Sequence, residues 1–196
     1  MKKIILRAVP RLKKRVSLVY SYKGKVIDEP NLPTGLKWDV ATIELIGQLM
    51  GNDEKRGVRL KKLIRQGAKG VIIHDGESWA AHGFFSPPGV ALPEHLPVKI
   101  VKNYWWLFNM HTRIGCRGQG LQKCCNRIRF QLINELNGSG HIMTDTGLYN
   151  IPARKGFIST GFSPKGFIYT IRLKLPKIGS KLIFWRWVRN GEHPKI

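Results

Sequence analysis

The spacing of apolar residues along the chain predicts alternating strands and helices. Short runs of β-branched and aromatic residues are typical of strands, and apolar residues at every third or fourth position are typical of helices. Strands are expected over residues 16–22, 70–74, 78–85, 104–112, 141–144 and 167–173. Helices are expected over residues 39–50, 53–66, 120–136 and 151–158.

The order of these elements, β-α-α-β-β-β-α-β-α-β, predicts a mixed α/β domain. Asp75 and Gly76 lie between two expected strands and indicate a hairpin, because Asp-Gly supplies the positive φ of a tight turn. The strand–helix–strand unit over residues 104–144 should hold its two strands parallel. We expect one domain over residues 16–175, a basic extension at 1–15 and an aromatic-basic extension at 176–196 that packs on the domain.

The charge of the chain changes this picture more than its composition does. The sequence has 34 Lys and Arg against 12 Asp and Glu, a formal net charge of +22 spread along its length. A nucleic acid, an anionic membrane or an acidic or phosphorylated substrate would each suit such a surface, and composition does not choose among them. Residues 175–189 interleave aromatic and basic side chains, which suits a last strand, a lipid contact or base stacking.

The cysteines indicate a reducing compartment. Cys116, Cys124 and Cys125 are odd in number and lack paired CxxC spacing, so neither a disulfide scaffold nor a metal site is expected. The apolar run at residues 4–6 is too short for an export signal, and no run is long enough to span a bilayer. We expect a cytoplasmic protein, with peripheral membrane contact through the basic face as the alternative.

A glycine-rich segment precedes the helix with the clearest apolar face. Gly115, Gly118 and Gly120 leave the backbone uncovered where the helix at 120–136 begins. Free amides, the helix dipole and Arg117 would together attract a diphosphate. The segment fits neither the Walker pattern nor GxGxxG. The alternative is a loop that only turns a strand into a helix.

The same segment resembles the acetyl-CoA motif of the GNAT N-acetyltransferases. In that family a strand ends in a loop of the form Gln/Arg-x-x-Gly-x-Gly/Ala that opens a helix. The matching residues here are Arg117, Gly118, Gln119, Gly120, Leu121 and Gln122, with Gln122 standing where the family has Gly or Ala. Asn150 to Ala153, followed by Gly161 and Phe162, is similar to a second motif of the family. The resemblance implies a GNAT-like fold: a mostly antiparallel sheet splayed between its fourth and fifth strands, with helices on both faces.

The resemblance also implies how the cofactor, acetyl-CoA or another acyl-CoA, is held. Residues 117–122 would bind its diphosphate through backbone amides. Met110 and Thr112 would hydrogen-bond the pantetheine arm by their backbone, and Asn150 would contact the arm lower down. Arg154 is a further candidate for a phosphate contact. An acyl carrier protein is the alternative donor.

The implied reaction is direct attack of a neutral primary amine on the thioester. The acceptor would be acidic or phosphorylated, either a small molecule or carrier-bound. A general base is needed because the amine arrives protonated. His111 and Asp145 are the candidate bases, and His82, near the end of an expected strand, is a further candidate. The family's usual tyrosine acid is replaced by Phe157, so Tyr149 and water are the candidate acids. The alternative function is a catalytically degenerate GNAT-like module that binds RNA or anionic membrane, and the oligomeric state, including a homodimer, is left open.

Overall fold

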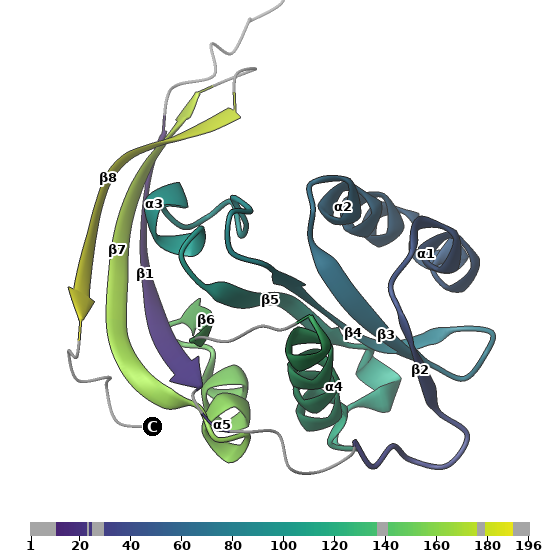
Figure 1. Ribbon diagram of the computed structural model, residues 1–196. Coiled ribbons are helices and arrows are strands. Elements are labelled where there is room, and N and C mark those ends of the chain that lie inside the picture. Colours follow the sequence, from purple (N-terminus) through teal and green to yellow (C-terminus); the bar gives the residue numbers. More distant parts are fainter. Residues whose placement is uncertain (1–10, 23, 25–29, 137–140, 176–178, 190–196) are drawn as a thin grey trace, which may run out of the picture.

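One mixed sheet organises the protein. The computed structural model describes residues 11–22, 24, 30–136, 141–175 and 179–189. Eight strands lie in the order β2-β3-β4-β5-β6-β1-β7-β8 (Figure 1). Their bounds are β1 Arg11–Tyr22, β2 Lys37–Val40, β3 Lys69–His74, β4 Trp79–Ser86, β5 Trp105–Thr112, β6 Ile142–Gly147, β7 Ser163–Leu175 and β8 Gly179–Arg189.

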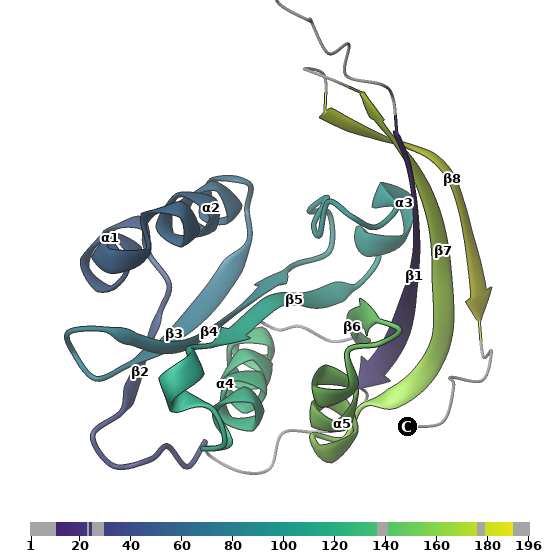
Figure 2. The same cartoon turned by 180° about the vertical axis from the view of Figure 1, so that it is seen from behind.

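Helices cover both faces of this sheet. Helices α1, α2 and α3 lie on one face and α4 and α5 on the other, as the two opposite views show (Figures 1 and 2). Their bounds are α1 Ile43–Leu49, α2 Glu54–Arg65, α3 Val98–Val101, α4 Leu121–Glu135 and α5 Ile151–Ser159. None of the helices in the described part of the chain is long and apolar enough to cross a membrane.

The sheet consists of two antiparallel halves joined by a short parallel pair. Strands β2 to β5 form one half, and β6, β1, β7 and β8 form the other. Between them β5 and β6 pair in parallel over three residues of each strand, Trp105 to Leu107 against Ile142 to Thr144. The expected mixed α/β fold, with a sheet that splays between these two strands, is therefore confirmed.

Hydrophobic packing fixes α4 against the sheet. Leu121, Cys124, Cys125 and Ile128 of α4 pack on apolar residues of β3 and β4. Gly83 of β4 allows this close approach, since a Cβ there would lie 2.7 Å from Sγ of Cys125. The two adjacent cysteines are buried fillers of this layer, as their position on the apolar face predicts.

The structure departs from the expected elements mainly at the edges of the sheet. Strand β1 begins at Arg11, so residues 11–15 of the expected extension are part of the sheet and pair with β7. Residues 37–40 form edge strand β2, so residues 39 and 40 are in a strand instead of starting the expected helix, and Thr42 caps α1 after them. Strand β8 completes the sheet on β7, but Phe184 and Trp185 remain exposed instead of packed.

Candidate functional site at the opening of the sheet

The sheet opens where β5 and β6 stop pairing. The last paired residues are Leu107 and Thr144, and the hydroxyl of Thr144 donates to the carbonyl of Leu107 at 3.0 Å. Strand β5 continues to Thr112 and β6 to Gly147 with no further pairing between them in the described residues. The β5 edge that faces β6, including residues 108–112, is thereby left without a neighbouring strand.

A bulge in β5 lies just beyond this point. His82 pairs with His111 and Phe84 with Phe108, so Asn109 and Met110 both face Gly83. Asn109 has φ +50°, a left-handed conformation that costs a non-glycine residue on the order of 1–3 kcal/mol. Such strained backbone is concentrated at functional sites, and here it turns the strand where the sheet opens.

A buried arginine supports the bulge from the α4 side. Arg129 donates to the carbonyl of Phe84 at 2.9 Å and lies 3.5 Å from the sulfur of Met110, and it also bonds the side chain of Asn126. Burial lowers the pKa of the Arg129 guanidinium. Its described partners are all neutral acceptors, which places a positive charge in the core beneath the bulge.

The glycine loop before α4 has the geometry of an anion site. Helices α1, α2 and α5 each begin with a side-chain cap, from Thr42, Asp53 and Asn150. Helix α4 begins instead after Gly120, at φ +71° and ψ +6°, and no side chain caps it. The amides of residues 118–122 donate to no acceptor within the described part of the chain. They remain available to a ligand.

The space around these amides is open. A Cβ added at Gly115, Gly118 or Gly120 would meet nothing within 4 Å, and residues 117–120 are exposed. Gln122 turns toward α5 instead, where its amide lies 2.7 Å from the position a Cβ would take on Gly156. The loop therefore fits a diphosphate, and Gln122 is the one residue of the motif committed to a contact between α4 and α5.

The second motif is partly engaged by the protein itself. Asn150 caps α5 by accepting from the amide of Ala153 at 3.4 Å, which leaves its own amide group as a donor. Arg154 is buried, donates to the carbonyl of Leu148 at 3.4 Å and interacts with the hydroxyl of Tyr20. A phosphate contact at Arg154 would require this network to open.

The candidate acid lies at the surface. Tyr149 is 89% exposed in the turn between β6 and α5. Phe157, at the position of the family's usual tyrosine, is buried and packs on the ring of Tyr20 at 5.3 Å between centroids.

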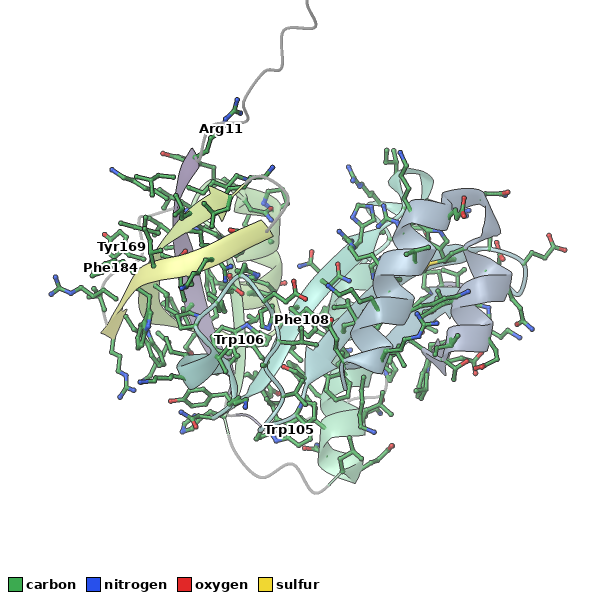
Figure 3. The ribbon with its side chains drawn as sticks, turned by 90° about the horizontal axis from the view of Figure 1, so that it is seen from above. Arg11, Trp105, Trp106, Phe108, Tyr169 and Phe184 are labelled. Carbon is green, nitrogen blue, oxygen red and sulfur yellow. The ribbon has the colours of Figure 1, made fainter. Side chains whose placement is uncertain are left out.

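A basic cavity lies on the opposite face of the opening from the glycine loop. Its volume is about 730 Å³, and α2, β1, β5, β7, β8 and the segment before α3 line it. Viewed from above, Phe108 and Trp106 lie between the α2 side and the β1–β7 side (Figure 3). Of its sixteen lining residues one is acidic, Glu94, and six are basic: Lys13, Lys14, Arg15, Arg59, Lys62 and Arg172.

Two donors in the lining of this cavity lack partners. The Nδ2 of Asn109 and the Nε of Arg172 are buried and make no hydrogen bond among the described residues. The side-chain oxygen of Asn109 is already used by Arg59, which donates to it at 3.0 Å. A buried donor without an acceptor is costly, so both groups favour a ligand rich in acceptor oxygens.

Asp145 lies beneath this cavity, one residue beyond the last paired residue of β6. Its carboxylate is 2% exposed and accepts from Nε2 of His95 at 2.8 Å, Arg15 at 3.3 Å and Nε1 of Trp106 at 3.3 Å. Burial raises the pKa of this carboxyl, but His95, Arg15 and Ser17 more than offset it, so its pKa is lowered overall. Asp145 is thus an ionised, fully engaged anchor, not a base that itself meets substrate.

The other candidate histidines face cations. His82 and His111 stack with ring centroids 6.0 Å apart on β4 and β5. Burial, then Arg56 and His111, lower the pKa of His82 to about 3. Burial, then Arg56 and Arg117, also lower the pKa of His111. Both favour neutral imidazole, and neither lines the basic cavity.

Sequence reasoning missed His95, Arg59, Lys62 and Arg172 as site residues. Arg59 and Lys62 are three positions apart on α2, so a shared face could have been read from their spacing. His95 lies between Pro93 and Pro97 in a segment without periodicity, and no local signal connects it with Asp145 fifty residues later.

Comparisons with known proteins agree with this geometry. No protein-family model matches the sequence, and no curated protein matches it. Among solved structures, a GNAT acetyltransferase from Colwellia psychrerythraea has a TM-score of 0.54 at 16% identity, covering 83% of this chain and 55% of that one. A GCN5-related N-acetyltransferase from Kribbella flavida has 0.51 at 12%, covering 84% and 59%. A tandem GNAT protein from the clavulanic acid biosynthesis pathway has 0.55 at 12%, covering 91% and 54%.

These likenesses concern the fold, because the identities are low. This chain spans a little over half the length of each of the three proteins. The likeness therefore shows a shared fold, and the activities named for those proteins are theirs.

Proposed function

We propose that this chain, which has the fold of the GNAT acetyltransferases, transfers an acyl group from acyl-CoA to a primary amine on an acidic or phosphorylated acceptor. Acetyl-CoA is the first donor to test. The observation that carries the proposal is the opening between β5 and β6, with an uncapped glycine loop on one face and a basic cavity on the other.

The residues present fit the diphosphate of a CoA thioester. Amides of residues 118–122 have no protein acceptor in the described residues, and Gly118 and Gly120 hold positive φ without crowding. The uncapped start of α4 adds the positive end of a fifteen-residue helix. When bound, the thioester supplies the activated acyl carbon. The unpaired edge of β5 beyond Leu107 would hold its arm through backbone groups.

The acceptor class follows from the cavity. Six cations against one carboxylate favour an anionic group, and the donors on Asn109 and Arg172 that have no partner among the described residues favour oxygen acceptors. At about 730 Å³ the cavity is of the size that holds a small-molecule ligand. The oxygens of a phosphate or carboxylate on the acceptor would satisfy both donors and orient the amine toward the opening.

Two measurements test the proposal. Calorimetry with acetyl-CoA and longer acyl-CoAs at about 0.15 M salt should show one saturable site, since exposed charges are screened beyond about 8 Å at that ionic strength. Turnover should then be followed as the release of free thiol with phosphoethanolamine or glucosamine 6-phosphate as acceptor. Ethanolamine and glucosamine, which lack the phosphate, are the controls. Absence of acyl-CoA binding would overturn the proposal.

The charge of the cavity gives a sharper version of the acceptor test. Lys13→Glu with Lys14→Glu should raise the KM for the phosphorylated amine at least tenfold, because two attractive charges become repulsive, and should leave acyl-CoA affinity within twofold. Lys55→Glu with Lys69→Glu, outside the cavity lining, is the matched control for net charge. Equal KM values for phosphorylated and unphosphorylated amines would overturn the acceptor assignment. Binding of RNA or anionic vesicles in place of acyl-CoA would favour the non-catalytic alternative.

A further inference from the structure

A second side-chain network lies within reach of the opening and has no role in the scheme above. His95 lines the basic cavity with 31% of its side chain exposed, and its Nε2 lies 2.8 Å from Oδ2 of Asp145. Asp145 is ionised and buried, so Nε2 is the ring nitrogen that carries the proton and donates it. Nδ1 is then left with its lone pair.

Several contacts fix this pair relative to the opening. Asp145 follows directly after Thr144, the last β6 residue paired with β5. Its second oxygen accepts from Nε1 of Trp106, a fully buried residue within the same three-residue pairing. Asp145 is thus anchored at the base of the opening, and His95 extends from it to the cavity wall.

We propose that His95, oriented by Asp145, is the base that takes the proton from the acceptor amine. This inference rests on the proposed acyl transfer and assigns its missing base. Asp145 acts here as a positioning residue, because its side chain is 2% exposed and its carboxylate is held by His95, Arg15 and Trp106.

The proton and bond balance of the step is simple. The ammonium nitrogen of the acceptor gives one proton to Nδ1 of His95, from which solvent removes it. The neutral nitrogen then forms a bond to the acyl carbon as the carbon–sulfur bond breaks, and its second proton ends on the thiolate sulfur. No oxidant or reductant takes part.

The charges around His95 favour this role over the other histidines. Nε2 of His95 contacts the carboxylate of Asp145 on β6 at 2.8 Å. His111 has no such carboxylate contact among the described residues, and burial, then Arg56, Arg117 and Arg59, lower its pKa. The other charged groups that line the cavity with His95 are Lys13, Lys14 and Arg15 of β1, Arg172 of β7, Arg59 and Lys62 of α2, and Glu94 beside it. Lys62 is paired with Glu94 at 3.1 Å and Arg15 with Asp145 at 3.3 Å, so two of these cations are partly neutralised.

The test compares His95→Gln with His141→Gln, which removes an exposed histidine just before β6. With acetyl-CoA and the best phosphorylated amine, His95→Gln should lower kcat about 100-fold, within the usual range for a general base, and leave the KM for acetyl-CoA unchanged. The deficit should shrink as pH rises toward the pKa of the amine, because more acceptor then arrives neutral. His141→Gln should behave as the native protein.

A nitrogen-15 NMR spectrum of labelled histidine gives a readout independent of turnover. His95 should show the proton on Nε2, and Asp145→Asn should shift that resonance and lower kcat by less than His95→Gln does. If His95→Gln keeps the kcat of the native protein, the base assignment is overturned and acyl transfer stands. A native protein that binds no acyl-CoA would overturn both. A tautomer with the proton on Nδ1 would overturn the proposed orientation.

Discussion

The glycine loop provides the most direct test of the proposed cofactor site, through Gly120→Val. Gly120 has φ +71° and ψ +6°, a conformation that a β-branched residue adopts at a cost on the order of 1–3 kcal/mol. The added side chain would meet nothing within 4 Å, so steric conflict inside the protein does not contribute. We expect the start of α4 to shift and the amides of residues 118–122 to lose their common direction.

The binding loss follows from the hydrogen bonds at stake. A hydrogen bond to a charged group contributes about 1.5–3 kcal/mol, and each 1.4 kcal/mol is tenfold in affinity. Loss of one amide–phosphate bond should therefore weaken CoA binding by at least about tenfold, and loss of two by about 100-fold or more. Isothermal calorimetry with CoA at about 0.15 M salt measures this directly, with the melting temperature recorded in parallel.

Gly89→Val is the matched control. Gly89 also has positive φ, +91°, and open surroundings, but it lies between β4 and α3, away from the start of α4. Both substitutions should lower stability by similar amounts, and a loss of about 1 kcal/mol shifts the melting temperature by about 2–4 °C in a chain of this size. Native CoA affinity in a folded Gly120→Val protein would refute the amide cradle. Equal affinity losses in both variants would refute its location.

Two further predictions concern stability. Gly83→Ala should lower the free energy of unfolding by about 1–3 kcal/mol through overpacking, since its Cβ would lie 2.7 Å from Sγ of Cys125 and 2.9 Å from Cζ of Arg129. Urea unfolding measures this loss, and Gly51→Ala, at an open position, is the control. Equal urea midpoints for the two variants would contradict the prediction. Because the pKa of His82 is about 3 in the folded protein and about 6.5 in an unfolded chain, stability should fall as the pH drops from about 6.5 to about 3. His82→Gln keeps an acceptor for Arg56, which lies 3.3 Å from Nε2 of His82, and should flatten that fall in a pH series of unfolding curves; an unchanged slope would contradict the assignment.

Local patterns predicted the centre of the fold better than its edges. Asp75 and Gly76 turn β3 into β4 as expected, with Gly76 at φ +108°, because the turn chemistry is contained in a few residues. The apolar stripe of α4 likewise gave its bounds within one residue at each end. By contrast, residues 11–15 are almost all basic, and their strand conformation comes from pairing with β7, which no local pattern records.

The candidate site also has one part that local sequence predicts and another that depends on contacts between distant residues. The glycine loop is a continuous segment, so its residue types were enough to predict an uncovered backbone at the start of α4, and its contact with a diphosphate stays a prediction. The basic cavity and the contact between His95 and Asp145 bring together α2, the segment before α3 and strands β1, β5, β6, β7 and β8, which are distant in sequence. Asp145 was recognised as a candidate, but its environment, which makes it an anchor, depends on residues up to 130 positions away.

The short seam between β5 and β6 has a mechanical consequence. Among the described residues, three on each strand carry the parallel hydrogen bonding between the two half-sheets, so main-chain bonding resists their separation weakly. Buried side chains from both sides of the join, such as Trp105 and Leu107 of β5 and Ile142 of β6, belong to one hydrophobic cluster and then set how far apart the halves rest. Core substitutions near that join would alter the gap in which we propose that donor and acceptor meet, although they would touch neither molecule.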